Sequence, residues 1–125
     1  MTPEGKVVAA IKKAVKELGG ETRKMTWVGH AGAPDLCILF PEVRLHILVE
    51  VKAPGEKPKP HQFREHEKLR AAGFLVWVTD DVHNFLWRLA VENGWTDHSP
   101  CCAFAYKAMA VHNRLKEKTC AKKRA

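Results

Sequence analysis

The 125-residue sequence predicts an α/β fold in which one mixed β-sheet is covered by helices. Segments with helical and strand-like apolar patterns follow one another in the order helix, three strands, helix, strand, helix, and a further helix comes last. A short connection around Pro41 and Glu42 indicates an antiparallel hairpin between the second and third strands. The fourth strand returns through a helix, and we therefore expect it to lie parallel to a strand of the same sheet.

The first segment is typical of an amphipathic helix. Thr2 is a suitable N-cap, Pro3 suits the first turn, and Glu4 complements the positive end of the helix dipole. Apolar residues recur at helical spacing from Val7 until two consecutive glycines, at positions 19–20, end the helix. Glu4 lies at the edge of the apolar stripe, a position that also suits a solvated glutamate with no further role.

Three strand-like runs follow, at residues 22–28, 35–40 and 45–51. The first alternates polar and apolar residues, the second is almost entirely apolar, and the third is apolar except for His46 and Glu50. The basic, proline-rich stretch at residues 52–60 suits neither a helix nor a central strand, so we expect a loop there.

The second half begins with a helix over residues 61–72 and a buried strand over residues 74–79. Asp80 or Asp81 is expected to cap the helix that follows this strand. His66, on the first of these helices, is expected to face solvent or to be partly packed.

The chain divides near Gly94 into a main domain, residues 1–94, and a helical extension, residues 95–125. A loop at residues 96–100 leads to a helix whose apolar stripe either covers the sheet of its own chain or is buried against a second copy. The stripe consists of Phe104, Ala108, Val111 and Leu115. The basic residues at 122–124 are expected to form a frayed tail.

Basic residues exceed acidic ones, which favours a polyanionic partner. Twenty-one Lys and Arg against 14 Asp and Glu give a net charge of +7 and a pI near 9.4, so nucleic acid is favoured over a membrane surface. No apolar run approaches the ~18–20 residues of a membrane span, and the start of the chain lacks the pattern of a secretory signal. We therefore expect a cytoplasmic protein with no membrane partner and with reduced cysteines. No structural zinc is expected, because the spacing of the candidate ligands fits no standard site: His98, Cys101, His112 and Cys120.

The residues with the most chemical promise lie at the ends of two neighbouring strands. Glu50 and Lys52 point to one face of their strand, whereas Val51 points to the other. An antiparallel hairpin would place Asp35, at the start of the second strand, beside Glu50. Two carboxylates that converge beside a lysine repel one another, and Mg²⁺ or Mn²⁺ would relieve that repulsion. Alternatively, Asp35 is a turn residue and Glu50 and Lys52 form a solvated pair of little energetic value.

The constellation resembles the PD-(D/E)xK nuclease superfamily and, more narrowly, the VRR-NUC family of virus-type replication-repair nucleases. The matching parts are Glu4 in the first helix, Gly-Ala-Pro-Asp ending at Asp35, Glu-Val-Lys ending at Lys52, and Gln62 near the start of the next helix. The resemblance covers about residues 1–90 and implies a restriction-endonuclease-like α-β-β-β-α-β core with a mixed central sheet.

The resemblance also implies the roles of individual residues. Asp35, Glu50 and the backbone carbonyl of Val51 would hold Mg²⁺ or Mn²⁺, and Glu4 would join them through water or a second metal ion. Lys52 would position or activate the attacking water and offset negative charge on the phosphate. Gln62 would orient Lys52 or that water. The implied activity is a structure-selective endonuclease that cuts branched DNA, such as four-way (Holliday) junctions, as a homodimer in a bacterial or phage-infected cell and leaves a 5′-phosphate.

Basic side chains near these motifs suit contacts to the DNA backbone, which give sequence-independent, salt-sensitive affinity. A solvated loop that needs lysine only for solubility would have the same composition. The candidate DNA-binding residues are Arg23, Lys24, His30, Lys57, Lys59, His61 and Arg64.

Two alternatives to a structure-selective endonuclease remain. One is a DNA-binding module of the same fold without catalysis, although such a module has no use for Asp35 and Glu50, whose charges repel phosphate. The other is a restriction-type nuclease that reads base edges in the major groove, for which the sequence offers no identifiable element.

Overall fold

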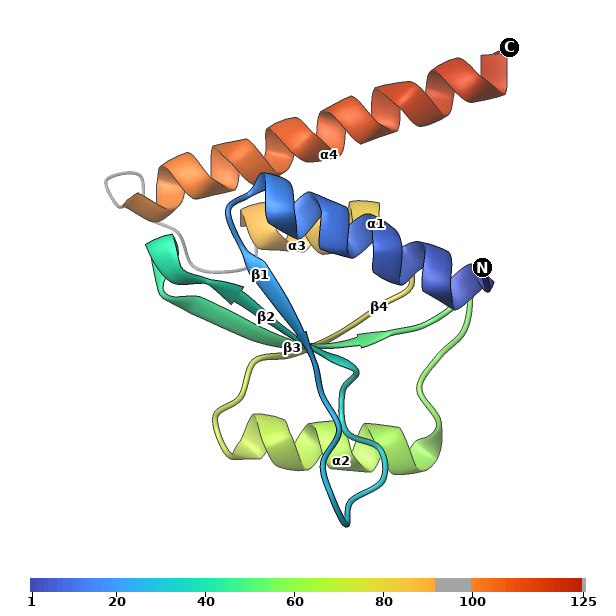
Figure 1. The fold of residues 1–125 in the computed structure, drawn as a ribbon, viewed down its shortest axis with the longest axis vertical. Coiled ribbons are helices and arrows are strands. Elements are labelled where there is room, and N and C mark those ends of the chain that lie inside the picture. The colour runs from blue at the N-terminus through green and yellow to red at the C-terminus, as the bar shows by residue number, and fades with distance from the viewer. Residues whose placement is uncertain (92–99, 125) are drawn as a thin grey trace.

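The computed structural model describes residues 1–91 and 100–124, with side chains described for residues 1–91 and 103–119. Within these residues, four strands form one mixed sheet between helices, as the sequence predicts (Figure 1). The elements in chain order are α1 (Pro3–Glu17), β1 (Glu21–Lys24), β2 (Leu36–Phe40), the short 3-10 helix η1 (Pro41–Val43), β3 (Leu45–Val51), α2 (Pro60–Ala71), β4 (Val76–Thr79), α3 (Val82–Val91) and α4 (Pro100–Arg124).

The strands lie in the sheet in the same order as in the chain. β1 pairs with β2 and β2 with β3 in antiparallel fashion, and η1 makes the predicted tight connection of the second hairpin. β4 lies parallel to β3, as expected from the crossover through α2. The sheet is therefore mixed, and the carboxyl end of β3 lies between neighbours of opposite direction.

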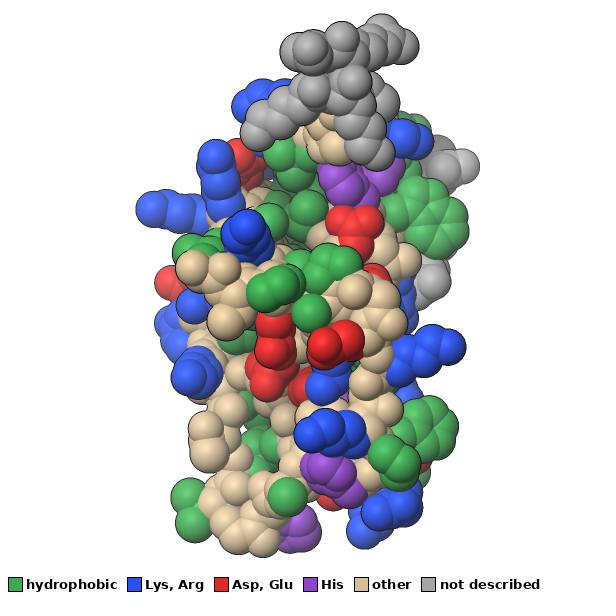
Figure 2. All heavy atoms as spheres, turned by 90° about the vertical axis from the view of Figure 1, so that its right-hand side faces the viewer, with side chains coloured by type: hydrophobic (Ala, Val, Ile, Leu, Met, Phe, Trp, Pro, Cys, Tyr) green, Lys and Arg blue, Asp and Glu red, His purple; other side chains and the backbone are tan. Residues whose placement is uncertain are grey.

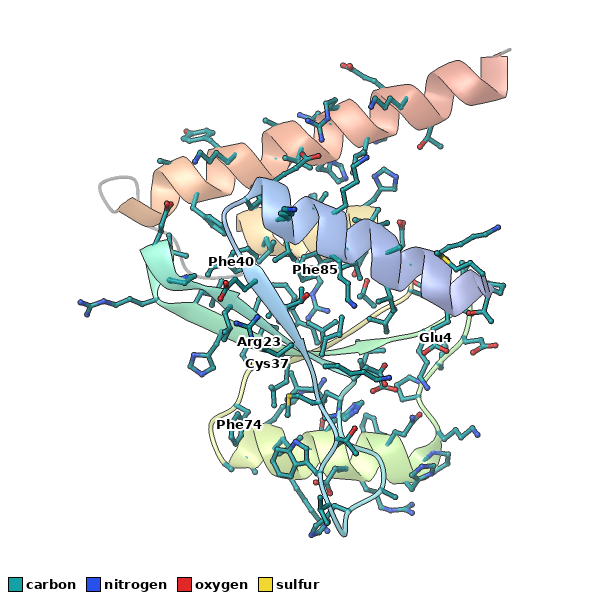
Figure 3. All side chains as sticks on the ribbon, viewed as in Figure 1. Glu4, Arg23, Cys37, Phe40, Phe74 and Phe85 are labelled. Atoms are coloured by element: carbon teal, nitrogen blue, oxygen red, sulfur yellow. The ribbon has the colours of Figure 1, made fainter. Side chains whose placement is uncertain are left out.

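The helices cover the two faces of the sheet unequally. α1, α3 and α4 lie on one face and α2 lies alone on the other (Figure 1). The larger core, on the side of α1, contains fully buried Phe40 and Phe85, both labelled in Figure 3. A smaller cluster of Leu48, Leu69 and Val76 lies under α2. Because side chains alternate along a strand, β3 sends Val49 and Val51 to the larger core and Glu50 to the face under α2.

Local sequence signals explain where the first and third helices begin. The Thr2 hydroxyl accepts a hydrogen bond from the Gly5 N–H at 3.0 Å, which confirms Thr2 as the N-cap of α1. Of the two candidate caps of α3, Asp81 performs this role, since its carboxylate accepts from the His83 N–H at 3.0 Å. Asp80 instead accepts from the Gly55 N–H in the proline-rich loop at 2.8 Å.

Several element boundaries differ from those expected. β1 ends at Lys24 rather than at residue 28, because the Met25 N–H donates to the Asp35 carbonyl and closes the base of a loop that leaves the sheet. The apolar residues in this loop, Met25 and Trp27, pack against the cluster under α2, which accounts for their strand-like alternation. β4 begins at residue 76 rather than 74, and α2 already begins at Pro60, which suits a first helical turn.

The C-terminal helix covers its own chain. Phe104 and Ala108 of α4 are buried in the larger core, and the Phe104 ring packs edge-to-face on Phe40 at a centroid distance of 4.8 Å. Of the two alternatives for the apolar stripe, the structure therefore shows the intramolecular one. The expected frayed tail is wrong for the backbone, since α4 continues through Arg124 and begins at Pro100, which was assigned to the preceding loop. His98 and the side chains of Cys101, Cys120 and residues 122–124 lie outside the described residues.

No helix in the described part of the chain has the length and apolar character needed to cross a membrane.

Candidate active site

Asp35 and Glu50 meet because of the register of the β2–β3 hairpin. Leu36 pairs with Val49, so the residue before β2 comes beside the residue after Val49. The Asp35 carboxylate accepts a hydrogen bond from the Val51 N–H at 3.0 Å, which holds it against the end of β3. The structure thus brings both acids to one place, although they are 15 positions apart in the chain.

Among the acidic residues that the structure describes, only Glu50 is buried. Its side chain is buried, with Oε1 at 3.1 Å from Gln62 Nε2 and 3.2 Å from Lys52 Nζ. Its second oxygen, Oε2, has no hydrogen-bond partner within the described structure. The pKa of Glu50 is raised to about 7, chiefly by burial and also by the negative charges of Asp35 and Glu4, while Lys52 opposes the rise.

Gln62 connects the start of α2 to the end of β3. Its carbonyl oxygen accepts from Lys52 Nζ at 2.8 Å and from the Lys59 N–H at 2.9 Å, and its amide nitrogen donates to Glu50. The same amide therefore satisfies a free N–H at the helix start and fixes the two charged residues of the Glu-Val-Lys motif.

Glu4 is the acidic residue that α1 contributes near the site. It is exposed in the first turn of α1, at the end of that helix labelled in Figure 3. Its negative charge contributes to the raised pKa of Glu50, which places the two carboxylates within electrostatic range. Figure 2 shows the face of the molecule that lies at the right-hand side of Figure 1. Acidic side chains gather near the centre of this face, with Lys and Arg side chains on both sides.

Gly32 explains the glycine in the sequence motif that ends at Asp35. Its φ of +89° lies in the region that favours glycine, and a Cβ at this position would come 3.2 Å from Gln62 Cα and from the His61 carbonyl oxygen. Only glycine therefore lets the loop after β1 lie directly on the start of α2, beside Gln62.

The seven candidate DNA-binding residues are all exposed, and they lie on three segments. Arg23 and Lys24 are on β1, where Arg23 forms an exposed ion pair with Glu21 at 3.1 Å. His30 is in the loop after β1, and the other four are in the proline-rich loop and the first turns of α2: Lys57, Lys59, His61 and Arg64. The contact of Gly32 with His61 brings the loop of His30 and the start of α2 together.

Two residues at this site were not predicted from the sequence. Asp80 was considered only as a helix cap, yet its bond to the Gly55 N–H anchors the basic loop beside the site. His66 was expected to be solvent-facing or partly packed, and this is wrong, because the ring has no exposed surface and Nε2 lies 3.9 Å from Glu50 Oε2. Its position one helical turn after Gln62 was an available signal, since residues four apart share a helix face.

Oxygen donors dominate the site. Asp35 and Glu50 provide carboxylates, Val51, whose N–H binds Asp35, carries a backbone carbonyl, and the charge of Glu4 acts on Glu50. Within residues 1–91 and the described part of α4, no three His, Cys, Asp or Glu side chains form a ready-made metal cluster. The donor set is that of a hard cation that keeps part of its water shell rather than that of zinc.

The raised pKa of Glu50 predicts a specific pH dependence of stability without divalent metal. The pKa is about 7 in the folded state against 4.5 for an unperturbed glutamate, so stability from the neutral carboxyl is present below pH 4.5 and lost as the pH rises through 7. We expect this loss to approach ~3 kcal/mol between pH 4.5 and pH 8. Urea unfolding in EDTA should show it in the wild type and not in Glu50→Gln. Parallel pH dependences of the two proteins would contradict the assignment.

Three comparisons with known proteins agree with one another. The family model of the VRR-NUC domain matches residues 5–80, which include Asp35, Glu50, Lys52 and Gln62. A phage protein named Putative nuclease p44, from Acyrthosiphon pisum secondary endosymbiont phage 1, is 46% identical over 66 residues, which cover 53% of this chain and 70% of that protein. A solved structure of a VRR-NUC domain matches with a TM-score of 0.65 and 36% identity over 76% of this chain and all of its own.

The fold, the site motifs and these matches all indicate the same protein family. The predicted resemblance is confirmed, because the family model covers more than half of the chain and the solved domain has the same fold. The chain belongs to the VRR-NUC family of nucleases.

Proposed function

We propose that this nuclease is a Mg²⁺- or Mn²⁺-dependent endodeoxyribonuclease that cuts phosphodiester bonds in branched DNA, such as four-way junctions, as a homodimer. The observation that carries the proposal is the network of Glu50, Lys52 and Gln62 with Asp35 held beside it by the Val51 N–H, in a domain of a nuclease family. The match to a phage protein supports activity in the cytoplasm of a bacterial or phage-infected cell.

The residues at the site fit a divalent cation. Asp35, Glu50 and the Val51 carbonyl would hold it, and Glu4 would contribute through water or a second ion. The fit is supported by the buried Glu50 Oε2, which has no protein partner in the described structure, and by the mutual repulsion that raises the pKa of Glu50. When bound, such an ion lowers the pKa of a coordinated water and polarises the scissile phosphate.

Lys52 would add the positive charge of a protein side chain to that of the metal ion at the site. Its side chain is 12% exposed, so the ammonium group is largely desolvated and still reaches the surface of the site. Gln62 and Glu50 fix Lys52 Nζ at 2.8 Å and 3.2 Å, which reduces the cost of ordering this flexible side chain. A preorganised ammonium of this kind orients an attacking water and stabilises the developing charge on a phosphate.

DNA would be held through its phosphates rather than its bases. The exposed basic residues lie on β1, in the loop after β1 and at the start of α2, and none lies on a helix that projects from the body of the protein. Lys and Arg side chains lie on both sides of the acidic side chains in Figure 2. Such contacts favour DNA by shape and charge, and affinity falls steeply with salt.

The proposed homodimer follows from the substrate. A four-way junction has a two-fold axis, and symmetric cutting of two strands needs two sites related by the same axis. The apolar stripe of α4 is buried on its own chain, so a dimer would use other surfaces.

Cleavage of a panel of labelled substrates tests the proposal. The panel contains a four-way junction, a flap and a linear duplex, each with Mn²⁺, Mg²⁺ or EDTA, at an oligomeric state measured by light scattering. We expect metal-dependent cleavage of the branched substrates in preference to the duplex, by a dimer. Binding without cleavage under every metal condition would favour the non-catalytic module, and cutting of one duplex sequence would favour the restriction-type reading.

A further inference from the structure

Two polar groups lie buried and unpartnered next to the proposed metal site. His66 on α2 has no exposed surface, and neither of its ring nitrogens has a hydrogen-bond partner among the described residues. Oε2 of Glu50 is in the same situation. His66 Nε2 and Glu50 Oε2 face each other at 3.9 Å, which is too far for a hydrogen bond.

This arrangement is unfavourable for the fold taken alone. A buried donor or acceptor without a partner destabilises a protein, whereas an apolar side chain of similar volume would not. The next buried residue on this face of α2 is Leu69, in the apolar cluster under the helix. A leucine at position 66 would therefore suit the packing. Packing does not explain why a histidine lies there, and the proposed metal site beside it offers a reason.

The position of His66 on α2 places it beside the Glu50 carboxylate. Gln62 and His66 are one turn apart on one face of the helix, and each faces a different oxygen of the Glu50 carboxylate. Gln62 already donates to Oε1, and His66 stands opposite Oε2. An imidazole ring always carries at least one N–H donor, and Nε2 is the ring nitrogen that faces Glu50.

We propose that His66 is a positioning residue for Glu50, with the Nε2–H of His66 donating to Glu50 Oε2 when Glu50 holds the metal ion. α2 then fixes both oxygens of the carboxylate, one through Gln62 and the other through His66. Hydrogen-bonded partners of metal-ligating groups commonly change metal affinity by about 10- to 100-fold. The inference rests on the proposed metal site and adds to it a residue that does not touch metal or DNA.

Two measurements without DNA test this role. Mn²⁺ affinity is measured by calorimetry and the melting temperature is measured in EDTA, for the wild type, His66→Leu and His66→Gln. His66→Leu keeps the volume and removes the donor, whereas His66→Gln keeps a donor at the same distance from the backbone. His46→Leu, an exchange at an exposed histidine on β3, is the matched control.

The two readouts should move in opposite directions. His66→Leu should bind Mn²⁺ about 10- to 100-fold more weakly and yet melt roughly 2–6 °C higher in EDTA, because an unpartnered polar group has left the core. His66→Gln should recover most of the affinity, and His46→Leu should match the wild type.

The outcomes separate this inference from the proposed function. If the wild type binds Mn²⁺ and His66→Leu binds it equally well, the role of His66 is overturned and the metal site stands. A lower melting temperature for His66→Leu, with weak binding that His66→Gln does not restore, would show a packing role and also overturns the inference. Absence of Mn²⁺ binding by the wild type overturns the proposed metal site, and the role of His66 falls with it.

Discussion

Asp35→Asn is expected to reduce metal-dependent cleavage by about 10³-fold or more, because the exchange removes one of the two carboxylates that would hold the cation. The fold should survive, since an asparagine oxygen can still accept the 3.0 Å hydrogen bond from the Val51 N–H. Metal-free DNA binding should become tighter at the same time, because a negative charge that faces phosphate has been removed. Unfolding of the variant would abolish both cleavage and DNA binding, so lost cleavage together with tighter binding would not result from unfolding.

Single-turnover cleavage with saturating enzyme and gel-shift binding in EDTA measure the two effects. Glu42→Gln is a suitable control, because Glu42 is an exposed acid in η1, at the opposite end of β3. It removes the same charge and should leave both quantities at wild-type values. Cleavage by Asp35→Asn within about threefold of the wild type would show that the hairpin acids do not hold the cation.

Lys52→Met should lower cleavage by about 10²- to 10³-fold through a different route. Methionine keeps most of the length and removes the ammonium group that contacts Gln62 at 2.8 Å and Glu50 at 3.2 Å. Since the hydrogen bond and positive charge of Lys52 lower the pKa of Glu50, that pKa should rise further in the variant. A smaller fraction of the protein would then have an ionised Glu50 at neutral pH, so part of the lost rate should return at higher pH.

The matched control is Lys57→Met, at an exposed lysine of the proline-rich loop. It should weaken DNA binding slightly and reduce its salt dependence, with the cleavage rate of bound DNA unchanged. Rate against pH between 6 and 9, measured for both variants under single-turnover conditions, distinguishes them. A Lys52→Met variant with wild-type cleavage of bound DNA would remove Lys52 from the proposed reaction.

The order of elements and the meeting of the two acids could be predicted because both depend on short-range patterns. The connection at Pro41 is too short for anything but a hairpin, and an antiparallel register then brings residue 35 to residue 50. The Glu-Val-Lys spacing likewise sends Val51 into the core and Glu50 to the other face, because strand side chains alternate.

Boundaries and burial were harder to predict because they depend on partners distant in the chain. Met25 and Trp27 alternate as strand residues do, but their apolar side chains pack under α2 instead of extending β1. The apolar stripe on α4 has the same pattern whether it covers its own sheet or a second copy. The contact of Phe104 with Phe40, which lies 64 positions earlier in the chain, shows that the stripe covers its own chain.

The amino-acid pattern alone was sufficient for the α/β class, the hairpin that joins Asp35 to Glu50, and membership of a nuclease family, because each depends on periodicity, turn chemistry or a local motif. Only the folded chain revealed that His66 lies buried against Glu50 and that Asp80 anchors the basic loop. Such pairings join elements whose relative position is decided by the packing of the whole core. A side chain's hydrogen-bond partners, and with them its charge state, follow from that packing and cannot be read from its neighbours in sequence.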